Sequence, residues 1–348
     1  MRNLYAIVKL SYSELFLGNI RSEGRRNMKK RLLGMGVATG LAIAMMGGTV
    51  VQAAETWTVT CPWAPSGVAA MVSQQAATKS TEYSDDLILV AEAVKGDAAT
   101  VNTWVASHAA GDPALVFAGE GLFSITSILD PAKLQFDYED FEFVENLYSS
   151  VFVLSAEASL EIDSIAALEE YVKSGETISV AVNGATSSEA FLAASLFGSM
   201  GAGDSLKLVP YESAAEAAQA VAKGETAFAV SHQSQILETF EQGDVTIACA
   251  FDEKALENGP FAGVEGVGEH GYPYFRNRCF VLAPADTEEE TVTELKTLYD
   301  DILADEEVTT WLQDTMLLEV DPMSEEDVQA HIDNVKSLVE EYKDVVAG

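Results

Sequence analysis

The sequence predicts an α/β fold, in which helices cover both faces of a parallel β-sheet. From Ala54 onward, short apolar runs rich in β-branched and aromatic residues alternate with Ala-rich or Glu-rich segments of helical period. The chain has 348 residues, 48% of them apolar, which is enough for one large or two medium-sized domains. The expected strands are one that ends before Pro62 and the runs 87–93, 114–119, 141–156, 177–184, 205–211, 226–232, 245–251 and 278–284.

Several segments carry their own start and stop signals for a helix. In SIAALEEYVKSG, residues 164–175, Ser164 is the expected N-cap and the closing glycine is the expected stop. SAAEAAQAVAKG, residues 213–224, follows the same pattern, and the C-terminal segment predicts one amphipathic helix capped at Ser324. The Gly- and Pro-rich stretch 257–277 predicts a surface loop, which could be a lid or a plain connection.

The N-terminal region predicts export. Residues 28–53 begin with Lys29, Lys30 and Arg31, continue as an apolar run and end in small residues, which is typical of a signal peptide cleaved near Ala53. A transmembrane anchor is the alternative, but no basic stop follows the run. We interpret residues 1–27 as an upstream segment translated from a start codon chosen too early. The expected location is periplasmic or otherwise extracytoplasmic.

The charge of the mature chain excludes some classes of partner. Without residues 1–53 the chain keeps 12 basic and 53 acidic residues, a net charge of −41. Such a chain is repelled by nucleic acid and by anionic membrane surfaces, so neither is an expected partner. Most of the acidic residues lie in segments that read as exposed helix faces, where they serve solubility.

Cysteine and histidine give no sign of a metal centre or a redox site. Cys61, Cys249 and Cys279 lie far apart, and we expect buried free thiols, although Cys249 and Cys279 could pair if their strands are neighbours. His108, His232 and His270 are isolated and lack the spacing of metal ligands. We therefore expect neither a metal nor a cofactor.

Two strand-to-helix turns made of small residues are the candidate binding elements. One is the turn 62–70 in CPWAPSGVAA, and the other is NGATSS, residues 183–188. Free N–H groups at a helix start, beside hydroxyls and without bulk, form a cradle for an anion. Both turns follow a strand, and in open α/β sheets ligands bind at the carboxyl ends of strands. The sequence has no motif of a hydrolase elbow, a phosphate loop, a dinucleotide fold or a zinc protease, so we do not expect an enzyme.

Four segments in the same order carry a family resemblance. The first turn CPWAPSG resembles a strand followed by Pro-aromatic-x-x-Gly-Gly, and residues 87–119 resemble the second strand, loop, helix and third strand of the same family. LKLVPYESAAEAAQAVAKGETAFAV resembles a Val-Pro-Tyr-Lys-Gly segment with its helix, and EHGYPYFRNRCFVLAPADT resembles Glu-x-Gly-Tyr-Pro followed by an Ala-Pro-x-x-Thr turn. Over nearly its whole mature length, the chain is similar to the extracytoplasmic solute receptors of the tripartite tricarboxylate transporter system, the Bug family.

The resemblance implies a two-lobed periplasmic binding protein fold of type II topology, with the ligand in the cleft between lobes. We expect lobe one to combine residues 54–153 with 249–348, and lobe two to hold 154–248. It further implies a monomer that captures a small carboxylate and delivers it to the membrane permease subunits of a tripartite transporter. Backbone amides of the two turns would hold the carboxylates. The expected ligand-binding residues are Trp63, Ala64, Pro65, Ser66, Gly67, Val68, Ala69, Asn183, Gly184, Ala185, Thr186, Ser187, Ser188, Tyr211 and Ser231.

The chain departs from the family pattern at positions that bear on the ligand. Ala70 stands where the family has Asp, Ser66 where it has Gly, and Glu212 where Lys is common. Phe191 takes the place of the usual His of the second helix, and the loop 183–188 aligns one residue either way. These departures leave the fold expectation intact and bear on the ligand class.

Four alternatives stay open. The protein could sense a ligand for a signalling partner, or be an exported α/β hydrolase with Ser187 or Ser188 as nucleophile. The cleft could also be negative and hold a cation or a zwitterion. The Ala70 that replaces the family's Asp argues against this, whereas Glu212 is compatible with it. If a basic side chain holds an anion, Arg276 or Arg278 from the Gly- and Pro-rich stretch is the candidate.

Overall fold

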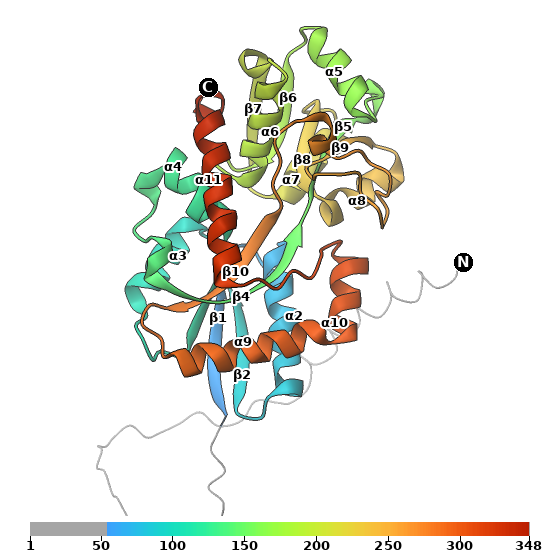
Figure 1. Ribbon diagram of the computed structural model, residues 1–348. Coiled ribbons are helices and arrows are strands. Elements are labelled where there is room, and N and C mark those ends of the chain that lie inside the picture. Colours follow the sequence, from blue (N-terminus) through green and yellow to red (C-terminus); the bar gives the residue numbers. More distant parts are fainter. Residues whose placement is uncertain (1–53, 348) are drawn as a thin grey trace, which may run out of the picture. The chain divides into compact units, whose positions relative to one another are not determined.

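The structure, a computed structural model, describes residues 54–347, which form two mixed five-stranded sheets in a two-lobed α/β fold (Figure 1). The predicted signal peptide, residues 28–53, and the upstream segment 1–27 lie outside the described residues. None of the helices in the described part is both long and apolar enough to cross a lipid bilayer.

The first sheet has the strand order β2-β1-β3-β10-β4. Strands β1, β2 and β3 are parallel and are joined by the crossover helices α2 and α3, whereas β10 is antiparallel to both β3 and β4. This is the type II order, in which a late strand enters the sheet from the other lobe. The bounds are β1 Glu55–Cys61, α2 Val68–Tyr83, β2 Leu87–Ala93, α3 Ala98–Ser107, β3 Ala114–Gly119, β4 Phe141–Ser150 and β10 Asn277–Pro284.

The second sheet repeats the arrangement with the order β7-β6-β8-β5-β9. Strand β6 is parallel to β7 and β8, and β5 is antiparallel to β8 and β9. The alternation of strands and helices predicted parallel sheets. Parallel pairing holds for β1, β2 and β3 and for β6, β7 and β8, whereas β10 and β5 run antiparallel to both of their neighbours. The bounds are β5 Phe152–Glu157, α5 Ile165–Lys173, β6 Ile178–Asn183, α6 Ser188–Ser199, β7 Leu206–Tyr211, α7 Ala214–Ala222, β8 Phe228–His232, α8 Gln233–Gln242 and β9 Val245–Ala250.

The chain passes between the sheets at two places. The run 141–156, predicted as one strand, divides at Val151, so that β4 lies in the first sheet and β5 in the second. The return passage runs from the end of β9 to the start of β10. Before it reaches β10, Phe251, Phe261 and Phe275 pack into the cores of the second sheet, so the segment 249–276 packs with that sheet and not with the first. We propose that the lobe boundary lies close to β10.

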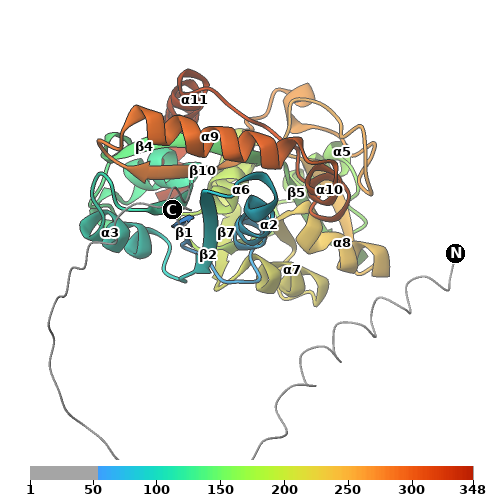
Figure 2. The same ribbon diagram turned by 90° about the horizontal axis from the view of Figure 1, so that it is seen from below.

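Each sheet is buried on both faces. In the first lobe, α2 and α9 (Glu289–Ala304) cover one face around Trp57, and α3 covers the other around Val116. Figure 2 shows α9 alongside β4 and β10. In the second lobe, α5 and α6 cover the face around Val180, and α7 and α8 cover the face around Ala181. Burial on both faces explains why these strands read as continuous apolar runs.

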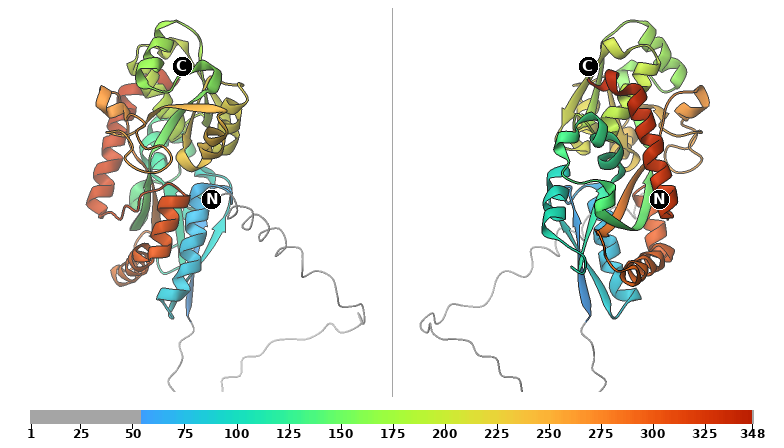
Figure 3. Two further views of the ribbon diagram at one scale, coloured as in Figure 1. Left: turned by 90° about the vertical axis from the view of Figure 1, so that its right-hand side faces the viewer. Right: turned by 60° about the vertical axis from the view of Figure 1, so that its left-hand side comes forward.

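Helix α11, Glu325–Ala347, packs against both lobes. Val328 and Ile332 pack in the core of the first sheet, whereas Val335 and Val339 pack in that of the second. Figure 3 shows α11 running from the level of one sheet to that of the other. The helix is therefore a third link between the lobes, beside the two chain passages.

The three predicted helix caps are confirmed. The hydroxyl oxygens of Ser164, Ser213 and Ser324 accept hydrogen bonds from the N–H groups of Ala167, Glu216 and Asp327, respectively. Short elements complete the fold: Leu122–Thr126, α4 Ser127–Leu129, Pro131–Lys133, Tyr138–Asp140, Ala158–Leu160, Gly203–Ser205, Val267–His270, α10 Glu306–Thr310 and Trp311–Thr315. The stretch 257–277 is irregular apart from one short helical turn, as predicted.

All three cysteines are buried and free, as expected. Cys249 lies in β9 of the second sheet and Cys279 in β10 of the first, so their strands are not neighbours.

Candidate functional site

A cavity of about 440 Å³ lies where the strands of both sheets end. The loops that follow β1, β2, β3, β6, β7 and β8 all line it. This is the place where ligands bind in open α/β sheets, and the volume falls within the range of small-molecule sites. We call this cavity the cleft.

The first turn presents the start of α2 to the cleft. Gly67 is the N-cap of α2 and has no side chain to cap it, and Met71 is the first residue whose N–H bonds back to the Gly67 carbonyl, at 3.1 Å. The N–H groups of Val68 and Ala69 therefore have no partner inside the helix. A Cβ added to Gly67 would lie 3.1 Å from the Ala64 carbonyl oxygen. The turn therefore has little room for a side chain at this position. The helix dipole adds a partial positive charge here.

The second turn presents a different chemistry. Gly184 has φ +88, which favours glycine, and Ser187 caps α6 by accepting from the Ala190 N–H at 3.1 Å. The hydroxyl of Ser188 donates to Glu120 at 3.5 Å, across from the other lobe. Glu189 follows in the first turn of α6 and lines the cleft although its side chain is buried. At this turn the carboxyl of Glu189 lines the cleft, in addition to backbone amides.

Burial raises the pKa of Glu189 to about 7, and the nearby charge of Asp97 adds to the increase. Its own backbone N–H and the nearby Ser187 oppose the increase. Glu189 therefore holds its proton more tightly than an ordinary glutamate.

Asp97 is a second carboxyl in the cleft. It follows β2 with φ +47, a backbone conformation that costs about 1–3 kcal/mol for a residue with a side chain. It accepts hydrogen bonds from the Ala98 N–H and the Trp63 indole. Its side chain is open to the water of the cleft, yet crowding by the surrounding protein raises its pKa. Strain of this kind gathers at binding sites.

Two polar contacts join the lobes at the cleft. Lys95 forms an ion pair with Glu212 at 3.1 Å, with both side chains exposed, and Lys133 donates to Thr186 at 3.4 Å. Exposed pairs of this kind contribute about 0.2–1 kcal/mol each. Such contacts can form and break at little cost in free energy. From the sequence, Glu212 was expected to influence the ligand class; in the structure it also pairs with Lys95 of the other lobe.

His232 lies where the chain first passes between the sheets. Its Nδ1 is 2.7 Å from the Ser150 hydroxyl, and its ring packs on Phe152 with centroids 4.4 Å apart. Burial lowers its pKa to about 4, so the ring is neutral at physiological pH. Within residues 54–347, no group of three His, Cys, Asp or Glu side chains is arranged to hold a metal ion.

Most of the sequence-predicted site residues line the cleft. These are Trp63, Ala64, Ser66, Gly67, Val68, Ala69, Asn183, Gly184, Thr186, Ser187, Ser188 and Tyr211. Pro65 and Ala185 point to solvent and Ser231 is buried in β8, and none of the three is among the lining residues. Sequence reasoning missed Asp97 and Glu189. Glu189 directly follows the predicted turn, and a first-turn position in the second helix was the signal that could have found it.

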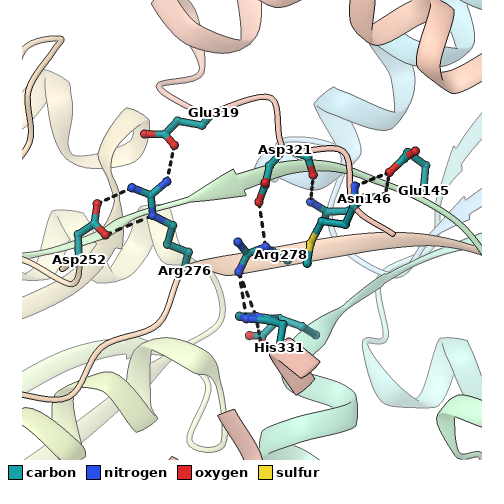
Figure 4. A network of polar contacts seen from close by, with 10 residues as sticks. Glu145, Asn146, Asp252, Arg276, Arg278, Glu319, Asp321 and His331 are labelled. Carbon is teal, nitrogen blue, oxygen red and sulfur yellow. Dashed lines mark hydrogen bonds and ion pairs between the residues drawn. The ribbon is translucent and has the colours of Figure 1, made fainter. Parts of the chain in front are cut away.

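The two arginines proposed as an alternative lie elsewhere. They line a separate, larger cavity of about 1250 Å³, which the stretch 252–260 and helix α11 also line. Arg276 donates to Asp252 at 2.7 Å and also pairs with Glu319, and Arg278 donates to Asp321 at 2.9 Å. Figure 4 shows both side chains held in this network, together with His331. Neither guanidinium lines the cleft.

The sequence model of the tripartite tricarboxylate transporter family receptors matches residues 87–342. The chain belongs to this receptor family. The match leaves out the first turn, so the role of that turn rests on its geometry. The family consists of extracytoplasmic solute receptors, that is, binding proteins.

Solved structures agree with the receptor fold. An R. palustris protein solved with adipate has a TM-score of 0.73 and 19% identity, with 84% of this chain and 97% of that chain covered. The MatC protein of Rhodopseudomonas palustris, solved with bound malate, has a TM-score of 0.68 and 21% identity, with 86% and 100% covered. The periplasmic binding protein BugD has a TM-score of 0.69 and 19% identity, with 83% and 97% covered. A search of curated proteins found no match.

Proposed function

We propose that this receptor is exported, captures a small carboxylate in the cleft and delivers it to the membrane permease subunits of a tripartite tricarboxylate-type transporter. One observation carries the proposal: the uncapped start of α2 opens into a cavity that loops of both lobes line. The N–H groups of Val68 and Ala69, together with the helix dipole, favour an anion at contact distance. The adipate and malate of the related structures are small carboxylates of the same kind.

The geometry argues against a hydrolase. The Ser187 hydroxyl donates to the Gly184 carbonyl at 3.2 Å, and that of Ser188 to Glu120 at 3.5 Å. A serine nucleophile needs a base within hydrogen-bond reach, commonly a histidine. Among the described residues, neither serine has a histidine as a hydrogen-bond partner.

A thermal-shift screen tests the binding step. The panel contains dicarboxylates, tricarboxylates, hydroxy acids, amino acids and aromatic acids. A ligand at about 100 times its dissociation constant stabilises the folded state by about 2.7 kcal/mol, which gives a clear rise in melting temperature. If no acid raises the melting temperature of the folded protein, the proposed function is wrong.

Uptake by cells tests the delivery step. Deletion of the receptor gene should abolish uptake of the identified acid, and the plasmid-borne gene should restore it. Normal uptake in the deletion strain would favour a sensory receptor over a transport component.

A further inference from the structure

Two carboxyls in the wall of the cleft form no ion pair within the described residues, although the charge of Lys133 acts on Asp97 and opposes the increase in its pKa. Neither Asp97 nor Glu189 forms an ion pair with any Lys, Arg or His among residues 54–347. The basic side chains nearest the cleft mouth are already engaged, Lys95 with Glu212 and Lys133 with Asp130 at 3.0 Å. The arginines are held in the separate network of the larger cavity.

A buried carboxylate without a cationic partner is unfavourable. Glu189 is only 5% exposed, and water reaches it little once a ligand fills the cleft. The start of α6 compensates part of the charge, but Asp97 lies near enough to oppose ionisation. A cationic group on the ligand would compensate the remaining negative charge of the two carboxyls, because an opposite charge at contact distance favours the ionised form.

The wall of the cleft therefore contains groups that favour opposite charges. The start of α2 offers free N–H groups and no acid in its first turn. Asp97 lies beside that turn, because its N–H donates to the Pro62 carbonyl at 2.9 Å and its carboxyl accepts from the Trp63 indole. The start of α6 offers Glu189. All of these groups line one cavity.

We propose that the ligand is a small amino acid, whose carboxylate meets the start of α2 and whose ammonium group meets Asp97 and Glu189. The inference rests on the proposed function and narrows its ligand class. An amino acid without a charged side chain also resolves the conflict between an anionic ligand and a protein whose residues 54–348 carry a net charge of −41, because such a zwitterion has no net charge.

A protonated Glu189 that donates to a dicarboxylate is the competing arrangement, and pH separates the two. Ammonium binding strengthens as pH rises through the titration of Glu189, up to the pKa of the ligand amine. Dicarboxylate binding on a protonated acid weakens over the same range. The other titratable groups that face Asp97 and Glu189 or line the cleft are Lys95, Lys133, Glu120, Glu212, His232, Tyr148, Tyr211 and Cys279.

Matched pairs of acids test the proposal by calorimetry. Alanine and lactate, aspartate and malate, and glutamate and 2-hydroxyglutarate differ only in an ammonium or a hydroxyl group. We expect the amino member of at least one pair to bind ten times more tightly or better, with affinity that rises between pH 6 and 8. Equal or tighter binding of the hydroxy members, or affinity that falls over this range, would overturn the proposal.

Isosteric variants supply the second arm. Glu189→Gln and Asp97→Asn should each weaken the amino member at least tenfold and leave the hydroxy member unchanged or tighter. Asn tolerates positive φ about as well as Asp, so the turn survives the change. Glu176→Gln and Asp85→Asn alter the net charge equally at exposed positions outside the cleft and should leave both affinities unchanged. Amino-acid affinity unaffected by both cleft substitutions would also overturn the proposal.

The outcome separates this inference from the proposed function. If hydroxy acids or dicarboxylates bind and amino acids do not, the function stands and the inference fails. If no acid binds protein whose circular dichroism and melting are normal, both fail.

Discussion

Gly67 determines how closely a ligand can approach the start of α2. The φ of Gly67 is one that any residue can adopt, so the site depends on the absence of a side chain here and not on the backbone freedom of glycine. A side chain here would crowd the Ala64 carbonyl and cover the free N–H groups of the next residues. The first turn is therefore sensitive to volume at one position.

Gly67→Val should reduce ligand affinity beyond detection. The melting temperature without ligand should stay within a few degrees, since a surface turn contributes little to the core. Ala185→Val is the matched control, because Ala185 is exposed and does not line the cleft. Calorimetry with the identified acid checks both variants. Normal binding by the Gly67 variant would mean that the turn serves only the fold.

Glu189 should make the stability of the ligand-free protein depend on pH. Its pKa is raised on folding from about 4.5 to about 7, so the folded state holds the proton more tightly than the unfolded state. The stabilisation is complete below pH 4.5 and is lost as pH rises through 7. Glu189→Gln should therefore gain stability relative to the parent over this window, by at most about 3 kcal/mol.

Urea unfolding of the parent and Glu189→Gln between pH 4.5 and 8 measures this difference. His232 acts in the opposite sense in the same window, since its folded pKa is lowered to about 4, but it is present in both proteins and cancels. A difference that does not change with pH would contradict the buried position of Glu189.

The sequence predicts some site residues and not others for a physical reason. The turn Trp63–Ala69 is readable because a strand, a Pro/Gly turn and a helix start are local features. Asp97 and Glu189 are two among 55 acidic residues, and only tertiary packing gives them a place in the cleft. Ser231 is buried in β8 and does not line the cleft, and its orientation was not readable because a strand residue can face either side of its sheet.

Element starts and stops were the most predictable part of the fold. The caps at Ser164, Ser213 and Ser324 hold as predicted because a cap is made within four residues. The division of 141–156 at Val151 was not readable, since both halves are equally apolar. Strand direction was not readable either, because β10 is antiparallel only through its return from the other lobe.

Helix α11 should stabilise both lobes together. Ile332→Ala removes a fully buried side chain from the core of the first sheet, and we expect a loss of about 2–5 kcal/mol in unfolding free energy. Ser337→Ala on the exposed side of the same helix should change it by less than about 0.5 kcal/mol. Denaturant unfolding measures both. Equal effects would mean that α11 is not packed as described.

At the scale of the whole molecule, the strongly negative charge, −41 for residues 54–348, sets the response of ligand affinity to salt. The Debye length falls from about 30 Å at 0.01 M to about 8 Å at 0.15 M salt, which removes long-range repulsion and leaves short contacts nearly intact. The affinity of a dicarboxylate should therefore rise with salt, whereas that of an amino acid should change little. Calorimetry at the two salt concentrations measures this. A sharp loss of affinity with salt would mean that a basic side chain holds the ligand.

The two-lobed arrangement came from the family resemblance, whereas composition and periodicity alone indicated only α/β. The net charge of the chain did not predict the chemistry of the cleft. The net charge describes the surface, whereas the wall of the cleft combines the free amides at the start of α2 with the carboxyls of Asp97 and Glu189.

A crystal structure of the receptor with its bound acid tests the central claim most directly. The account predicts the ligand in the cleft, with a carboxylate oxygen within hydrogen-bond distance of the N–H of Val68 or Ala69. A ligand seated in the larger cavity, or one held by Arg276 or Arg278, would contradict it.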